Sequence, residues 1–115
     1  MKIRKKSVEP VDFDGLKIID YTSDKNMSSS MAEITVPPGV QHKMAWSKRS
    51  DKFYYIVSGC IHFQIEDETY DLFEGDACVV EKGRRFCYSN LTKNESKLIL
   101  FHTPSFDMES EVFEE

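Results

Sequence analysis

If this protein is an enzyme, proton transfer is the chemistry for which its sequence offers candidate residues. The candidate catalytic residues are Lys52, Tyr54, Tyr88 and His102. Burial lowers the pKa of a lysine, so that it can act as a base or form a Schiff base, while a tyrosine hydroxyl can serve as the acid. Lys52 and Tyr54 lie two residues apart in an extended segment, and they therefore share one face of a strand.

Nucleophilic catalysis has less support in the sequence. Ser47 and Cys87 have no base near them in the chain, and the sequence contains neither a nucleophile elbow nor a glycine-rich phosphate loop. The cysteines are three in number and lack a C-x-x-C spacing, which argues against a disulfide framework or a zinc knuckle.

The elements that must position these residues are strands. Short β-branched and aromatic runs recur between turn signals, and no longer stretch has helical periodicity, which is typical of an all-β barrel or jelly roll. The predicted strands are 16–21, 30–36, 43–47, 53–57, 60–66, 69–72, 77–80, 86–90 and 97–102.

A spaced set of glycines marks the turns of this pattern. Gly39 and Gly59 bracket the first half, Gly75 and Gly83 open the second, and Asn90 closes it. The layout resembles the cupin superfamily, whose motifs read G-x5-H-x-H-x(3,4)-E-x6-G and G-x5-P-x-G-x2-H-x3-N. The resemblance implies an all-β fold, a cupin-type jelly-roll β-barrel in a single domain.

That domain is expected to cover residues 1–115. The core barrel takes about 32–104, preceded by an N-terminal strand segment, 1–31, and followed by an acidic C-terminal tail, 105–115.

The metal site of the family is the part that this sequence lacks. In many cupins four motif positions hold one divalent metal, and here those positions are Ala45, Ser47, Lys52 and Phe86. Alanine and phenylalanine offer no lone pair and a lysine cation repels the ion. We therefore expect no metal and no other cofactor.

Three histidines are the remaining possible metal ligands or bases. Strict alternation along the strand turns His42 away from the barrel interior, and His62 alternates with two apolar residues. His102 ends the last predicted strand, near a barrel mouth, and begins an H-T-P-x-F-D segment similar to the closing segment of small bacterial and archaeal cupins. A non-standard metal site built from these histidines stays open.

A lysine in place of the family's glutamate changes the expected ligand. An inward Lys52 attracts anions, so we expect the barrel to bind a small, anionic organic molecule. Its expected contacts are Ser47, Arg49, Lys52, Tyr54, Phe86, Tyr88 and Asn90. Lys52 could instead reach the rim and pair with Asp51 or with a glutamate of a neighbouring loop.

Two other functions stay open. One is an enzyme of the sugar-isomerase or epimerase type, which some cupins achieve without a metal and which would use the Lys, Tyr and His residues as acid and base. The other is a dimerisation module without a ligand, as in the cupin domain of the centromere protein C family, which a barrel without a cavity would favour.

Composition limits the partners. The 115 residues carry a net charge of −5 and a pI near 5.2, which disfavours nucleic acid and anionic membranes. The sequence has no apolar run of membrane-spanning length, and no apolar stretch follows the basic start of the chain. A cytoplasmic protein is the expectation.

A homodimer is expected from the strand that includes Lys52. Phe53 and Tyr55 alternate with the inward residues, and Met44 and Trp46 point outward by the same rule. Exposed aromatic surface of this kind usually marks an interface.

Overall fold

The computed structural model describes residues 1–114, which form two packed β-sheets. Its elements in chain order are η1 (Lys5–Ser7), β1 (Val11–Phe13), β2 (Leu16–Asp20), β3 (Ser30–Val36), β4 (Gln41–Ser47), β5 (Asp51–Ser58), β6 (Cys60–Ile65), β7 (Glu68–Phe73), β8 (Ala77–Val80), β9 (Phe86–Ser89), β10 (Ser96–Thr103), η2 (Met108–Ser110) and β11 (Glu111–Phe113). Within this range, no helix is long and apolar enough to cross a lipid bilayer.

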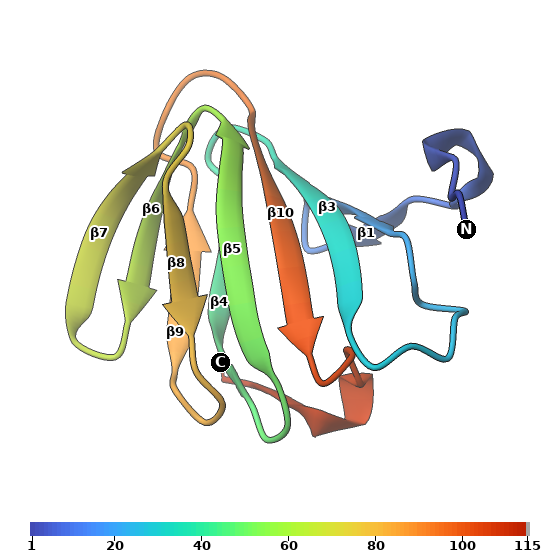
Figure 1. Ribbon diagram of the computed structural model, residues 1–115. Helices are drawn as coiled ribbons and strands as arrows, with labels where there is room; N and C mark the ends of the chain where they lie inside the picture. Colours follow the sequence, from blue (N-terminus) through green and yellow to red (C-terminus); the bar gives the residue numbers. More distant parts are fainter. Residues whose placement is uncertain (115) are drawn as a thin grey trace.

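The two sheets are antiparallel and face each other in the manner of a jelly roll (Figure 1). One sheet has the order β1-β2-β3-β10-β5-β8, and the other β11-β4-β9-β6-β7. All nine predicted strands are present, and the expected all-β jelly roll is confirmed. Strands β1 and β11, which have three residues each, were not predicted from the sequence.

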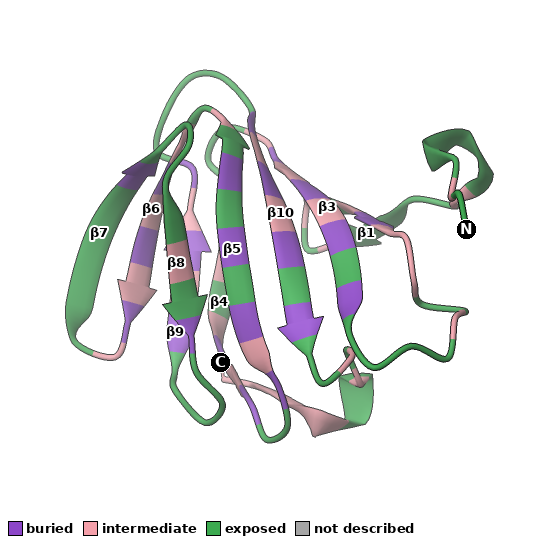
Figure 2. Cartoon of the chain, in the orientation of Figure 1, coloured by how far each residue is buried: buried purple, intermediate pink, exposed green. Residues whose placement is uncertain are grey.

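Strand β5 alternates between the core and the outside, as predicted. Lys52 and Tyr54 are 3% and 2% exposed, whereas Phe53 and Tyr55 on the other face are 39% and 46% exposed. Figure 2 shows the same alternation along the neighbouring strand β10. The barrel interior therefore receives Lys52, Tyr54 and Ile56, and an aromatic surface lies outside.

The core between the sheets is built around four aromatic side chains from β5, β6 and β9. The ring centroids of Tyr54, Phe63, Phe86 and Tyr88 lie 5.0–6.1 Å apart, and all four residues are buried. Buried aromatic pairs in such arrangements contribute about 0.5–1.5 kcal/mol beyond their area. They form a rigid floor for whatever lies toward the open end of the barrel.

A β-bulge in β4 overturns one prediction. His42 pairs with Tyr88 and Ala45 pairs with Phe86, so that two residues of β4, Lys43 and Met44, oppose a single residue of β9. The extra residue reverses the alternation. His42 therefore faces the barrel interior, although strict alternation had placed it outside.

The predicted outer surface also needs a correction. Met44 and Trp46 lie on β4 of the five-stranded sheet, where both are partly buried, and Trp46 pairs with Val112. Phe53 and Tyr55 lie on the six-stranded sheet. The four side chains therefore do not form one surface.

The acidic C-terminal segment returns to the barrel. After η2, strand β11 pairs with β4, with Glu111 opposite Ser47 and Phe113 opposite Ala45. Arg85 holds the end of the segment through two hydrogen bonds to the Glu114 carboxylate, of 2.8 and 2.7 Å. The segment thus closes one side of the open barrel end.

One glycine of the motif has a clear packing reason. Gly59 has a φ of +86°, and a Cβ atom there would lie 2.2 Å from the Ser96 hydroxyl. That hydroxyl both receives a hydrogen bond from the Cys60 amide and donates one to the Cys60 carbonyl, each 3.0 Å long. Only glycine fits this corner between β5 and β6.

Candidate functional site

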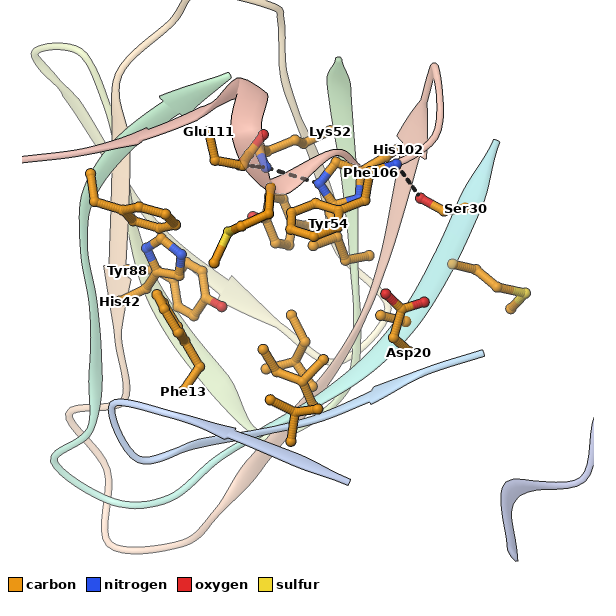
Figure 3. A pocket seen from close by; sticks show the side chains of 18 residues that line it. Phe13, Asp20, Ser30, His42, Lys52, Tyr54, Tyr88, His102, Phe106 and Glu111 are labelled. Atoms are coloured by element: carbon orange, nitrogen blue, oxygen red, sulfur yellow. Dashed lines mark hydrogen bonds and ion pairs between the residues drawn. The ribbon is translucent and has the colours of Figure 1, made fainter. Parts of the chain in front are cut away.

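A cavity of about 210 Å³ opens between the two sheets at the end of the barrel covered by the C-terminal segment. Its walls are mostly apolar, and its polar side chains come from β2, β3, β4, β5, β9, β10 and β11 (Figure 3). They are Asp20, Ser30, His42, Lys52, Tyr54, Tyr88, His102 and Glu111.

A buried lysine forms the centre of this site. Lys52 Nζ lies 2.5 Å from Glu111 Oε1 and 2.9 Å from His102 Nε2. The Lys52 and Glu111 side chains are each 4% exposed, and the Phe86 ring centroid lies 5.4 Å from the ammonium group. Side chains from β5, β10 and β11 therefore meet at this lysine.

The pKa shifts of Lys52 and His102 follow from burial and from their contacts. Burial lowers the pKa of Lys52, and the Glu111 carboxylate partly offsets this effect. Burial, with the Lys52 charge as a further cause, lowers the pKa of His102 to about 3. His102 is therefore neutral at pH 7, and because an ammonium can only donate, Nε2 is its acceptor nitrogen.

His42 and Tyr88 form a second polar pair on the wall of the cavity. Their rings stack with centroids 5.1 Å apart, and His42 Nδ1 lies 2.7 Å from the Lys43 carbonyl oxygen. Nδ1 must carry the proton for that contact, which leaves Nε2 as a free acceptor. Burial lowers the pKa of His42 to about 4 and raises that of Tyr88, so both groups are neutral at pH 7.

Two buried polar atoms of the site lack partners among the described residues. They are the Tyr88 hydroxyl and Glu111 Oε2. Buried polar atoms are nearly always hydrogen-bonded, and an unpartnered one points to a bound water or ligand. Both belong to side chains that line the same cavity.

Asp20 provides polar character on another wall of the cavity (Figure 3). Its Oδ1 accepts a hydrogen bond of 3.1 Å from the Thr22 amide. Partial burial raises the pKa of its carboxyl group. Ser30 is already occupied, because its hydroxyl accepts a hydrogen bond of 2.8 Å from the Phe106 amide.

The structure brings together all four candidate catalytic residues, Lys52, Tyr54, Tyr88 and His102, around one cavity. Phe86 lies just behind them, against the lysine.

Besides Phe86, three predicted ligand contacts, Ser47, Arg49 and Asn90, do not line the cavity. Ser47 accepts hydrogen bonds from the Arg49 and Ser50 amides, and the Arg49 side chain donates to Ser105. Asn90 is fully buried, and its amide bonds to the chain around it.

The expectation of an anionic ligand rested on an unpaired Lys52, and this premise is wrong. The partner is Glu111 of β11, not Asp51 or a loop glutamate, and the pair lies inside the barrel, not at its rim. Asp51 instead accepts a hydrogen bond from the Lys82 amide.

Glu111, His42 and Asp20 were not predicted from the sequence to belong to this site. Glu111 belongs to a three-residue strand inside an acidic tail, and the inward turn of His42 depends on a bulge without a sequence signal. The remaining histidine, His62, lies on an exposed surface, where Nδ1 is 2.8 Å from Asp71 Oδ1.

The residues do not fit the metal site of the cupin fold. Ala45 and Phe86, which have no donor atoms, lie directly opposite each other, and Lys52 fills the space between carboxylate and imidazole. Residues 1–114 contain no group of three or more His, Cys, Asp or Glu side chains suited to an ion.

Comparison with protein families settles the relationship. The sequence profile of the cupin domain matches residues 32–102, more than half of the chain. The chain is a cupin. No curated protein sequence matches this cupin.

Solved structures share the fold of this cupin at low sequence identity. The nucleoside dehydratase Pac13 of Streptomyces has a TM-score of 0.86 at 21% identity, over 99% of this chain and 90% of its own. Variants of that protein with a tyrosine or a histidine replaced have been solved with uridine.

Two further neighbours share the fold. A predicted oxalate decarboxylase of Thermotoga maritima has a TM-score of 0.82 at 17% identity, over 90% of this chain and 99% of its own. The cupin domain of Cnp3 from Schizosaccharomyces pombe has a TM-score of 0.76 at 19% identity, over 90% of this chain and 72% of its own.

Proposed function

We propose that this cupin is an acid–base enzyme that acts on a small, uncharged, hydroxylated organic molecule. The single observation that carries the proposal is the unused hydrogen-bonding capacity around one cavity. The Tyr88 hydroxyl and Glu111 Oε2 are buried without a partner among the described residues, and His42, whose Nε2 is an acceptor, stacks on Tyr88 and lines the same cavity. A hydroxylated ligand would satisfy all three atoms.

The reaction class follows from the protonation states. His42 is neutral at pH 7, so Nε2 can take a proton from a carbon or hydroxyl group of the ligand. The hydroxyls of Tyr88 and Tyr54, whose pKa values burial raises, keep their protons and can donate them to a developing oxygen anion or a leaving hydroxyl. Removal of a proton with loss of water is a dehydration, and return of the proton elsewhere is an isomerisation.

Lys52 contributes a fixed positive charge close to the reacting atoms. Held by Glu111 and His102 in a buried position, it needs no reorganisation when negative charge develops on the ligand. Its own charge is balanced by the carboxylate, which favours an uncharged ligand. An anionic ligand stays the second candidate, because the ammonium group has one hydrogen left after its two contacts.

The likeness to Pac13 supports the dehydratase form of the proposal. That protein is a nucleoside dehydratase, and its uridine-bound variants replace histidine and tyrosine, the residue types that line the cavity here. A nucleoside, or another ring with hydroxyl groups, is therefore our first ligand class. A dehydratase and an isomerase would share the same first proton transfer.

The dimerisation module without a ligand has less support. That alternative called for a barrel without a cavity, whereas the cavity here measures about 210 Å³ and has polar groups from several strands.

Ligand binding provides the test. We would titrate the protein with uridine, ribose, glucuronate and uridine 5′-monophosphate and follow binding by ligand-observed NMR. We expect uridine or ribose to bind more tightly than the two anions. Binding of the anions alone would overturn the uncharged class in favour of the anionic one, and the absence of any binding would contradict the choice of nucleosides and sugars.

Matched variants connect binding to the cavity. Tyr88→Phe and His42→Gln should each weaken binding about tenfold, since one hydrogen bond is lost at about 1.4 kcal/mol. Tyr70→Phe and His62→Gln change the same residue types at exposed positions on β7 and β6 and should leave binding unchanged. Equal effects of both pairs would place the ligand elsewhere.

A further inference from the structure

We propose that Asp20 determines the specificity of the cavity by binding a hydrogen-bond donor on the part of the ligand that lies away from Lys52. The inference rests on the proposed function, because it concerns the same cavity and takes a hydroxylated ring compound as its ligand. It adds one requirement on that ligand, which is an N–H donor remote from its hydroxyl groups. Uridine, whose base has one imide N–H, meets this requirement.

The strand register places Asp20 in one inward row with Tyr54. The row crosses β2, β3, β10 and β5 through the pairs Asp20–Ala32, Ala32–Leu100 and Leu100–Tyr54. Ala32, Leu100 and Tyr54 are buried, so the row faces the barrel interior. Neighbouring strands are about 4.8 Å apart, so about 14 Å separates the backbone at the two ends of the row. Asp20 therefore lines the cavity on the side away from Lys52 and Tyr54.

The wall around Asp20 is otherwise apolar. Strands β1, β2, β3 and β10 line the cavity with Val11, Phe13, Ile18, Met31, Ala32, Ile34 and Leu100. The Ser30 hydroxyl on the same side already accepts the hydrogen bond from the Phe106 amide. A ligand that lies along this wall can therefore make a directional contact with Asp20 and mainly van der Waals contacts with the side chains around it.

The charge of Asp20 is not neutralised by a cation. Of the two carboxylates that line the cavity among the described residues, Glu111 is paired with Lys52. Within residues 1–114, no Lys, Arg or His side chain lies at ion-pair distance from Asp20. A partly buried carboxylate without a counter-charge is stabilised by any donor that a ligand brings to it.

Local hydrogen bonding holds the carboxylate of Asp20 in place. The Thr22 amide donates to Oδ1 over 3.1 Å, and Figure 3 shows both oxygens on the cavity side of β2. An ionised carboxylate has about four acceptor sites, so these contacts leave capacity for a ligand donor. Because the ionised group can only accept, it favours N–H and O–H groups and repels carbonyl or phosphate oxygens.

Uridine illustrates how one ligand would use both sides of the cavity. With its ribose hydroxyls at the unpartnered Tyr88 hydroxyl and Glu111 Oε2, its base would extend along the apolar wall. The imide N–H is the only hydrogen-bond donor of that base, and it would bind Asp20. A base without this donor would turn only acceptor atoms or apolar groups toward the carboxylate, which is unfavourable.

Binding of uridine and 3-methyluridine tests the proposal, because the methyl group replaces the only N–H of the base. We expect ligand-observed NMR to show that the wild type binds uridine about tenfold more tightly, since a charge-assisted hydrogen bond is lost with the methyl group. Asp20→Asn keeps the size of the side chain but removes its charge. The preference should then fall to about threefold, because a neutral hydrogen bond has about half the strength.

Asp24→Asn is the matched control. Asp24 lies in the loop after β2, is paired with Lys25 at 3.4 Å and does not line this cavity, so its replacement should leave the preference unchanged. Equal binding of the two nucleosides to the wild type would overturn the role of Asp20 but leave the proposed function intact. So would a tenfold preference that persists in Asp20→Asn, which indicates a steric effect of the methyl group, or an equal loss of preference in Asp24→Asn. If neither uridine nor ribose binds, the proposed function fails, and this inference fails with it.

Discussion

Removing the carboxylate that holds Lys52 should be the most informative perturbation of this protein. In Glu111→Gln the ammonium group would lose its counter-charge and keep only uncharged acceptors, a glutamine amide oxygen and His102 Nε2 at 2.9 Å, inside a site where the lysine is 3% exposed. Breaking a buried ion pair on one side costs about 3–5 kcal/mol. For a domain of this size such a loss lowers Tm by on the order of 10–25 °C.

An independent upper limit on this loss of stability has a similar value. Lys52 can avoid being a buried unpaired charge by releasing its proton. The free energy that deprotonation costs is set by the difference between the pH and the unfolded pKa of 10.5. At about 1.4 kcal/mol per pH unit, deprotonation costs about 5 kcal/mol at pH 7 and about 2 kcal/mol at pH 9. The charge penalty in the variant cannot exceed these values.

The sign of the pH dependence follows. In Glu111→Gln the folded pKa of Lys52 falls further below 10.5, because the group that raised it is gone. Between the two pKa values the unfolded chain binds more protons than the folded one, so stability rises with pH. The difference in free energy of unfolding between variant and wild type should therefore be largest near pH 7 and decrease toward pH 9.

Urea unfolding at pH 7, 8 and 9 measures these quantities. Glu114→Gln is the matched control, because that carboxylate pairs with the exposed Arg85 and its loss should change the free energy of unfolding much less. The double variant Lys52→Met, Glu111→Gln should recover most of the lost stability, since no charge is left buried. If Glu111→Gln lowered the free energy of unfolding by less than about 1 kcal/mol, or if its difference from wild type did not depend on pH, the buried ion pair would be refuted.

Three further predictions concern the histidines, metal content and the Asn90 network. Burial holds the pKa of His42 near 4 and that of His102 near 3, below the ordinary 6.5. As the pH drops from about 6.5 to 4, the unfolded chain therefore takes up protons before the folded one does, and the free energy of unfolding should fall. Urea midpoints that stay constant over this range would contradict the neutral histidines. Elemental analysis of the purified protein should find no stoichiometric transition metal, and one iron, manganese, nickel or zinc per chain would overturn that expectation. Asn90→Ala removes hydrogen bonds to Val36, Thr92 and Asn94 and should cost about 2–3 kcal/mol in urea unfolding, whereas a change below 0.5 kcal/mol would show that this network is dispensable.

Much of the fold could be predicted because alternation and turn residues act locally. The predicted strands 30–36 and 77–80 coincide with β3 and β8, and the two faces of β5 follow from one inward residue. Each of these features depends on neighbours one or two positions away. Glycines such as Gly59 add corners whose backbone conformation other residues resist.

The candidate site was harder to predict because its decisive contacts are long-range. The Lys52–Glu111 contact joins residues 59 positions apart, through a strand of three residues whose pairing with β4 depends on the whole barrel. A single extra residue in β4 reversed the orientation of His42, and nothing in the local sequence marks that bulge. Lysine, tyrosines and one histidine could be selected by residue type, but their partners could not.

The same geometry explains how a cupin barrel can have a positive centre without the family's metal ligands. The Lys52 ammonium is held by a carboxylate oxygen at 2.5 Å and an imidazole nitrogen at 2.9 Å, which are donor types that metal ions also use. These donors come from the end of β10 and from β11, outside the motif positions that Ala45, Ser47 and Phe86 occupy. An ammonium group can donate its remaining hydrogen to a substrate oxygen, but it cannot polarise that oxygen as a Lewis acid. We infer that chemistry around it depends on proton transfer by the neighbouring histidine and tyrosines, with the ammonium group stabilising the negative charge that forms.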